Sequence, residues 1–237
     1  MAEAILRISG KEDRVSTRSK RRILLEVAAA YALIMLVIWT PRPWQKILWW
    51  IAAAAVAAIA AASFNGIQAL GLGKKNLLKS LWIAAAALLM AAIAIIVAIG
   101  LHTLHLPSGG AFAFVKVYWA YALWACFQQL LLQAFFLPHF LRLFPSRINA
   151  ALVAAGLFAL AHLPNPTLTP LTLLWGFVAC LLFLHYRNVY PLALAHVVFG
   201  ITIAITVPGP LSHNMRVGLG YLTYHRPIRN SNRLPQP

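Results

Sequence analysis

Seven long apolar segments constrain the fold of this chain more than any other feature. Each is close to the roughly 20 residues that an α-helix needs to cross about 30 Å of hydrocarbon. Of the 237 residues, 62% are hydrophobic and 10% are charged, against about 45–50% and 25% in ordinary soluble domains. The sequence therefore predicts an all-α, polytopic transmembrane bundle of about seven spanning helices, and it excludes a soluble enzyme or a disordered chain. The predicted spans are residues 23–40, 47–64, 77–101, 115–137, 148–163, 168–186 and 189–207.

Composition divides the chain into three regions. Residues 1–22 form a basic N-terminal segment, residues 23–207 form the transmembrane bundle, and residues 208–237 form a polar tail that we expect to be irregular or interfacial. Prolines such as Pro138 and Pro164 mark the ends of predicted spans, because a missing amide hydrogen does least harm there.

Positive charge predicts the orientation of the bundle. The formal net charge is +16, and Lys and Arg concentrate in the cytoplasmic loops of membrane proteins. With a cytoplasmic N-terminus, 13 of the 20 Lys and Arg residues lie on the cytoplasmic side of the predicted spans. We therefore expect the basic segment in the cytoplasm of a bacterial cell, with the bundle in the inner membrane. The lipid bilayer is the expected partner, and we expect no nucleic acid partner, because no basic stripe is interleaved with exposed aromatic residues.

Carboxylates are almost absent from the chain. The only acidic residues are Glu3, Glu12, Asp13 and Glu26, so no Asp or Glu follows Glu26. A mechanism that needs a carboxylate base inside the membrane would therefore have to take it from Glu26, from a partner or from the substrate.

Polar side chains within the predicted spans are costly in lipid and mark positions with a task. The fourth span contains Gln128, Gln129 and Gln133, of which the last two are four residues apart and share a helix face. Interhelical hydrogen bonding is the simplest use of these amides. His162 and His196 lie in the fifth and seventh spans. A single histidine in a membrane more often makes a structural hydrogen bond, but two neutral imidazoles from different helices, with nearby oxygen ligands, suit a zinc site.

The other histidines have a simpler interpretation. They stand in loops, at the ends of the predicted spans or in the tail, where we expect them to be solvated or interfacial. They are His102, His105, His139, His185, His213 and His225.

Three short motifs follow one another on separate predicted helices. The first places two adjacent glutamines four and five residues before a third, the second places a phenylalanine four residues before a histidine, and the third places a histidine four residues before a glycine. They are Gln128-Gln129-x-x-x-Gln133, Phe158-x-x-x-His162 and His196-x-x-x-Gly200.

This arrangement resembles the CPBP family of intramembrane metalloproteases, which includes CAAX prenyl proteases and bacteriocin-processing or self-immunity proteins. The family pattern is Glu-Glu-x-x-x-Arg, Phe-x-x-x-His and His-x-x-x-Asn or Asp on successive motif helices. The resemblance covers about residues 115–207. The second motif is intact here, the third has Gly200 in place of Asn, and the first has Gln at both Glu positions and at the Arg position.

The resemblance implies a membrane-embedded endopeptidase that processes or binds membrane-associated or prenylated peptides. In the family, a glutamate activates the attacking water. Carried over, His162 and His196 would hold a divalent metal such as zinc or polarise a water, Gln129 would orient that water, and Gln128 and Gln133 would fix the helix. A glutamine amide does not accept a proton as a base does, and losing a general base commonly costs about 10²–10⁴-fold in rate.

Three functions remain open from the sequence. The first is a hydrolase of this family with an altered site. The second is a pseudoprotease whose cavity binds a transmembrane or lipidated peptide, as a chaperone, scaffold or immunity factor. The third, a transporter or channel, has less support because the sequence shows no internal repeat.

Metal content separates the first two functions. One zinc or similar ion per chain in the purified protein, lost in a His162→Ala/His196→Ala variant, would support the metalloprotease. No specific metal in either protein would contradict it and would favour a glutamine-lined binding cavity. Elemental analysis of the detergent-solubilised proteins makes the comparison.

Overall fold

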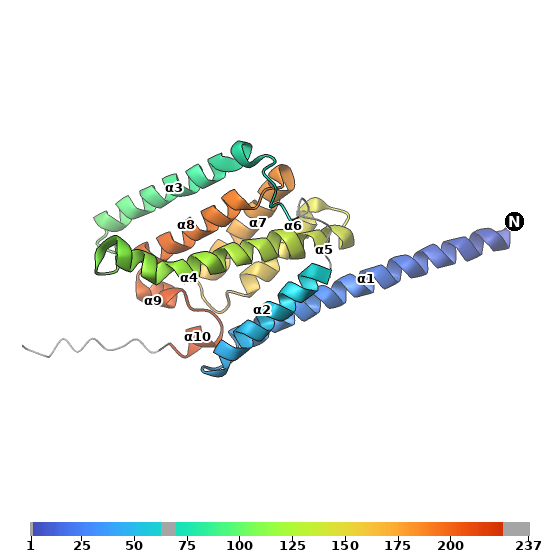
Figure 1. Ribbon diagram of the computed structural model, residues 1–237, viewed down its shortest axis with the longest axis horizontal. Helices are drawn as coiled ribbons and strands as arrows, with labels where there is room; N and C mark the ends of the chain where they lie inside the picture. Colours follow the sequence, from blue (N-terminus) through green and yellow to red (C-terminus); the bar gives the residue numbers. More distant parts are fainter. Residues whose placement is uncertain (1, 63–69, 225–237) are drawn as a thin grey trace, which may run out of the picture.

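A computed structural model describes residues 2–62 and 70–224, with side chains described for residues 19–59 and 70–224. The described chain is a bundle of long helices with no β-strand (Figure 1). The elements are α1 (Ala2–Ile38), α2 (Trp44–Ala62), α3 (Leu77–Gly100), α4 (Gly110–Leu131), the π-helical turn η1 (Leu132–Phe136), α5 (Leu137–Leu143), α6 (Arg147–Leu160), α7 (Leu168–Tyr186), α8 (Tyr190–Thr206), α9 (Gly209–Ser212), the 3₁₀ turn η2 (His213–Met215) and α10 (Leu219–Leu222).

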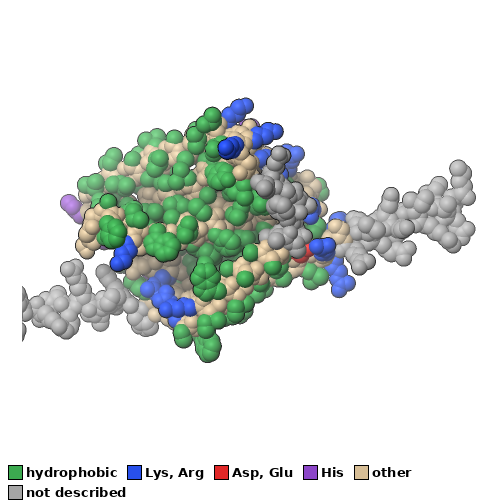
Figure 2. All heavy atoms as spheres, in the orientation of Figure 1, with side chains coloured by type: hydrophobic (Ala, Val, Ile, Leu, Met, Phe, Trp, Pro, Cys, Tyr) green, Lys and Arg blue, Asp and Glu red, His purple; other side chains and the backbone are tan. Residues whose placement is uncertain are grey.

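The predicted membrane bundle is confirmed. Three helical stretches in the described chain are long and apolar enough to cross a membrane: Leu77–Gly100, Gly110–Leu143 and Leu168–Tyr186. Shorter apolar helices accompany them at Trp44–Ile59, Arg147–Leu160 and Tyr190–Thr206. Hydrophobic side chains cover most of the face seen in Figure 2, and Lys and Arg gather toward its ends. A surface of this kind is suited to contact with lipid rather than with water.

The fourth predicted span differs from the structure at both ends. Its helix begins at Gly110 rather than at residue 115, and the helical stretch continues through Pro138 to Leu143. The expectation that Pro138 ends the helix is therefore wrong. The physical reason is the π-helical turn η1, in which the Leu137 amide donates to the Leu132 carbonyl, five residues back. Pro138 then falls in the first turn of a new α-helical register, where no amide hydrogen is needed.

Helices α6 and α7 pack against each other through small residues. Ala150, Ala151, Ala154 and Ala155 of α6 are buried. Gly176 of α7 lies against this surface, since a Cβ built on it would come within 3.1 Å of Phe158 and 3.4 Å of Ala155. Small residues allow the backbones to approach closely, which is the main source of helix association in lipid.

The sequence suggested that His139 is solvated or interfacial, and the structure shows that this expectation is wrong. The His139 side chain is buried, with 3% of its surface exposed. Its Nδ1 lies 2.7 Å from the Phe135 carbonyl oxygen, and its Nε2 lies 3.0 Å from a carboxylate oxygen of Glu26. Glu26 also accepts a hydrogen bond from Arg22. The last carboxylate of the chain therefore joins α1 to α5.

A buried asparagine ties two loops together at the end of the bundle where α3 begins. Asn188, between α7 and α8, is fully buried. Its side-chain amide donates to the carbonyl oxygens of Gly73 and Lys75, at 3.0 and 3.1 Å. Its side-chain oxygen accepts from the Tyr190 amide at 3.1 Å, which satisfies the first turn of α8.

Replacement of Asn188 by Ala should therefore destabilise the fold. Three backbone groups would lose their hydrogen-bond partner. A fully buried group left without a partner costs about 1–3 kcal/mol. Because these loops are partly exposed and water can replace some of the lost bonds, we expect the free energy of unfolding to fall by about 2 kcal/mol in total. The apparent melting temperature in detergent measures the effect. Asn149→Ala is the matched control, because the Asn149 side chain is exposed. Equal melting temperatures for the two variants would contradict the assignment.

Candidate functional site

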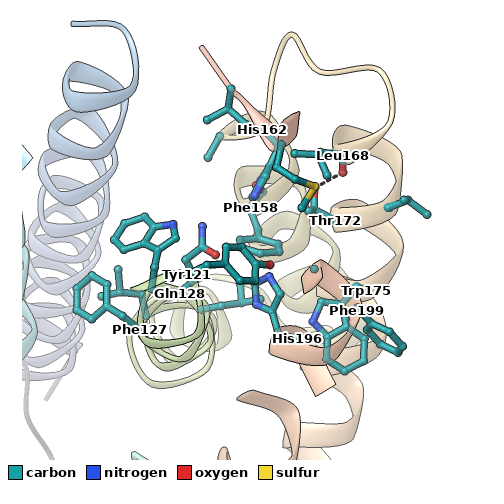
Figure 3. A pocket seen from close by; sticks show the side chains of 18 of the residues that line it. Tyr121, Phe127, Gln128, Phe158, His162, Leu168, Thr172, Trp175, His196 and Phe199 are labelled. Carbon is teal, nitrogen blue, oxygen red and sulfur yellow. Dashed lines mark hydrogen bonds between the residues drawn. The ribbon is translucent and has the colours of Figure 1, made fainter. Parts of the chain in front are cut away.

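A large cavity of about 1390 Å³ lies among α1, α2, α3, α4, α6, α7 and α8. Its wall is largely apolar, with tryptophans from several helices. A few polar side chains interrupt that wall, as Figure 3 shows in part. They include Tyr121, Gln128, His162, Thr172 and His196, together with Arg42, Gln45 and Lys46 near the turn between α1 and α2. A mostly apolar cavity with a few convergent polar groups is typical of a binding site.

His162 lies just beyond the end of α6, in the turn that leads to α7. Its Nδ1 is 2.7 Å from the Phe158 carbonyl oxygen. A carbonyl oxygen only accepts, so Nδ1 carries the proton and Nε2 keeps its lone pair. The four-residue spacing of Phe158 and His162 thus allows the His162 side chain to donate to the Phe158 backbone carbonyl, and this bond orients the imidazole.

Asn165 holds this turn in place, a role that sequence reasoning missed. The side chain is fully buried, and its amide donates to the carbonyl oxygens of Ser212 and Arg216 at 2.8 and 2.9 Å. Its oxygen accepts from the amides of Thr167 and Leu168. Irregular backbone at membrane depth is tolerated only where its polar groups are satisfied in this way.

The tail expected to be irregular or interfacial is partly ordered by these bonds. It forms the short elements α9, η2 and α10, and the Gly218 amide donates to the Leu163 carbonyl at 2.7 Å. Met215 and Val217 of this segment reach the cavity wall. The tail therefore closes part of the cavity beside His162.

A chain of side-chain hydrogen bonds joins α4 to α8. The Gln133 amide nitrogen lies 3.3 Å from the Gln129 side-chain oxygen, and the Gln129 amide nitrogen lies 3.2 Å from Nδ1 of His196. Both glutamines are fully buried, and His196 is 6% exposed. With each amide donating, Nδ1 of His196 accepts and its Nε2 carries the proton. The two histidines therefore differ: His162 keeps a lone pair on Nε2, while His196 keeps a hydrogen there.

The structure places Gln128 and Gln129 differently with respect to the cavity. Gln128 lines the cavity, whereas Gln129 lies behind the wall and orients His196. A water-orienting amide at this site would therefore be Gln128 rather than Gln129. Adjacent residues on a helix point about 100° apart, so the sequence alone could not decide which amide faces inward.

Phe158 connects the two histidines. Its ring centroid lies 4.9 Å from that of His162 and 5.6 Å from that of His196, both edge to face. Figure 3 shows the Phe158 side chain between the two imidazoles. The two motifs thus meet at one place although 34 residues separate His162 from His196.

The donor set for a metal is small. Among the residues that the structure describes, no group of three or more His, Cys, Asp or Glu side chains could hold a metal ion. Catalytic zinc sites use three protein ligands, whereas this site offers two imidazoles, and the nitrogen exposed by His196 carries a proton in the bonding pattern above. These residues do not make a zinc site on their own, so zinc binding by His162 and His196 stays a prediction.

Gly200, at the position of the family's Asn, contacts Tyr121. A Cβ on Gly200 would overlap the hydroxyl oxygen of Tyr121. The phenol of α4 therefore occupies the space directly above Gly200, where a side chain would begin. The sequence reasoning missed Tyr121, because no motif contains it and only the packing of α4 against α8 brings it to the site.

Comparison with known proteins gives a family match over part of this chain. Residues 110–202 match the family model described as type II CAAX prenyl endopeptidase Rce1-like, and no curated protein or solved structure matches the chain. The matched residues run from the first residue of α4 into α8 and contain all three motifs. The predicted CPBP resemblance is confirmed over these residues, and this part of the helical membrane bundle is similar to type II CAAX prenyl endopeptidases.

The buried bond between Gln129 and His196 generates a test. A Gln129→Glu variant puts a carboxylate into a fully buried position without a positive partner, which costs about 3 kcal/mol or more. We expect a clearly lower melting temperature in detergent, and recovery of most of the loss when Gln133→Arg supplies the opposite charge four residues away.

Gln128→Glu is the matched control for this test. Its side chain faces the cavity, so the new carboxylate should be better solvated and the loss smaller. A Gln129→Glu variant as stable as the wild type would contradict the buried bonding pattern.

Proposed function

We propose that this protein binds a membrane-associated, lipidated peptide in its cavity and does not hydrolyse it by the carboxylate mechanism of its family. It would then act as a pseudoprotease, as a chaperone, scaffold or immunity factor for that peptide. The observation that carries the proposal is the neutral bond between Gln129 and His196 in a site to which α2–α8 contribute no carboxylate.

The electrostatics of the site support binding over hydrolysis. A water needs a proton acceptor to become a nucleophile, and glutamine amides do not provide one. Glu26 already contacts Arg22 and His139, and Glu26 and His139 are outside the set of residues that line the cavity. The candidate carboxylate identified in the sequence is therefore committed elsewhere.

The shape and chemistry of the cavity suit a lipidated peptide. Its volume of about 1390 Å³ exceeds the roughly 300–1,000 Å³ of typical small-molecule sites, so an isoprenyl or acyl chain and a short peptide have room. The apolar walls match the hydrocarbon chain, and the polar cluster around the two histidines matches a peptide backbone.

One observation favours hydrolysis as a second candidate. Because Nδ1 of His162 donates to the Phe158 carbonyl, its Nε2 lone pair is available inside the cavity. An imidazole in this tautomer can take a proton from water as a general base. In that case Gln128 would orient the water, and hydrolysis would depend on His162.

A binding and cleavage assay with one substrate decides between these functions. We expect an S-farnesylated, fluorescent peptide to bind the purified protein in nanodiscs while mass spectrometry finds no cleaved product. His162→Ala should weaken binding by roughly three- to ten-fold, as expected for loss of about one hydrogen bond, and the unfarnesylated peptide should bind much more weakly.

The control and the contrary outcomes are specific. His185→Ala leaves the cavity untouched, because His185 is exposed at the end of α7, and it should bind normally. Cleavage that His162→Ala abolishes would establish the second candidate. Equal affinity for peptides with and without farnesyl would overturn the proposed lipidated ligand.

A further inference from the structure

The contact between Tyr121 and Gly200 joins two helices at the polar cluster. Any side chain at position 200 would collide with the Tyr121 phenol, since its hydroxyl oxygen and ring carbons occupy the Cβ position. Gly200 follows His196 by four residues, so the two share one face of α8. The Tyr121 hydroxyl therefore lies on the face of α8 that carries His196, about one helical turn away.

The Tyr121 hydroxyl is available to a ligand. The side chain is half-buried and lines the cavity, and within the described part of the chain no side chain or carbonyl oxygen is hydrogen-bonded to its O–H. A tyrosine in an apolar setting ordinarily finds a hydrogen-bond partner. Figure 3 shows the Tyr121 side chain beside those of Gln128, Phe158 and His196.

The donors and acceptors of the cluster match a peptide group. Tyr121 offers an O–H, and His196, whose Nδ1 accepts from Gln129, offers its Nε2–H. A carbonyl oxygen has two lone pairs and can use such donors. His162 offers the complementary lone pair on Nε2, which suits the N–H of an amide.

We infer that the Tyr121 hydroxyl, which occupies the space that Gly200 leaves open, binds a backbone carbonyl oxygen of the peptide ligand. This inference rests on the proposed function and names the part of the ligand that the polar cluster recognises. Gly200 then determines whether the ligand carbonyl is recognised. Glycine leaves room for the Tyr121 phenol beside α8, and a larger residue at this position would displace the phenol.

The test compares three forms of one ligand. They are an S-farnesylated tetrapeptide, its ester analogue at the peptide bond after the modified cysteine, which keeps the carbonyl, and its trans-alkene analogue, which lacks the carbonyl. We expect the wild type in nanodiscs to bind the amide and the ester about three- to ten-fold more tightly than the alkene, the ratio for one net hydrogen bond. In Tyr121→Phe this preference should disappear, while affinity for the alkene is unchanged.

Tyr118→Phe is the matched control. Tyr118 lies on the same helix, three residues earlier, and packs against Phe114 with ring centroids 4.9 Å apart. It is not among the residues that line the cavity. The variant should keep the full preference for the carbonyl forms, which separates loss of this hydroxyl from loss of any tyrosine hydroxyl on α4.

Gly200→Ala provides a second, independent variant. Its Cβ would push the Tyr121 phenol away, so the preference should disappear although the hydroxyl remains in the protein. A purely structural Tyr121 would move overall affinity or stability without moving the ratio between ligands.

The outcomes separate the role of Tyr121 from the proposed function of the cavity. Wild-type protein that binds the farnesylated forms with no preference for the carbonyl, or a preference that persists in Tyr121→Phe, would overturn the role of Tyr121 and leave the proposed function standing. Wild-type protein that binds none of the three forms would overturn the proposed function and this inference with it.

Discussion

The hydrogen bond between Gln129 and His196 is the interaction on which the rest of the site depends. It connects α4 with α8 in a fully buried place, where an unpaired polar group would cost several kcal/mol. Gln133 supplies the next bond in the same direction, so the three side chains form one neutral chain of donors and acceptors. Neutrality avoids the desolvation cost that a buried ion pair at these positions would carry.

This neutral chain also determines what the cavity can do. It orients His196 with a hydrogen facing the cavity, while the backbone bond to Phe158 orients His162 with a lone pair facing it. The result is a pair of differently polarised imidazoles in an apolar space, without a negative charge. Such a site is suited to recognising an amide, and α2–α8 offer no carboxylate to activate a water.

Two buried asparagines make this arrangement possible at the ends of the short helices. Asn165 joins the turn after α6 to the tail segment, and Asn188 joins the turn before α8 to the loop before α3. Both satisfy backbone groups that lipid could not. These hydrogen bonds fix the turn that contains His162 and the start of the helix that contains His196. The distance between the two histidines is therefore set by the loop contacts as well as by helix packing.

The sequence by itself determined the all-helical membrane bundle, because apolar runs of spanning length have few other solutions, and it identified the motif residues through their spacing. It misplaced His139 and the end of the fourth helix, since a buried partner on α1 and a π-helical turn leave no local signal. It also could not say which of two adjacent glutamines faces the cavity or that Tyr121 meets Gly200. Those facts depend on the rotation and approach of α4 against α8, and only tertiary packing sets these.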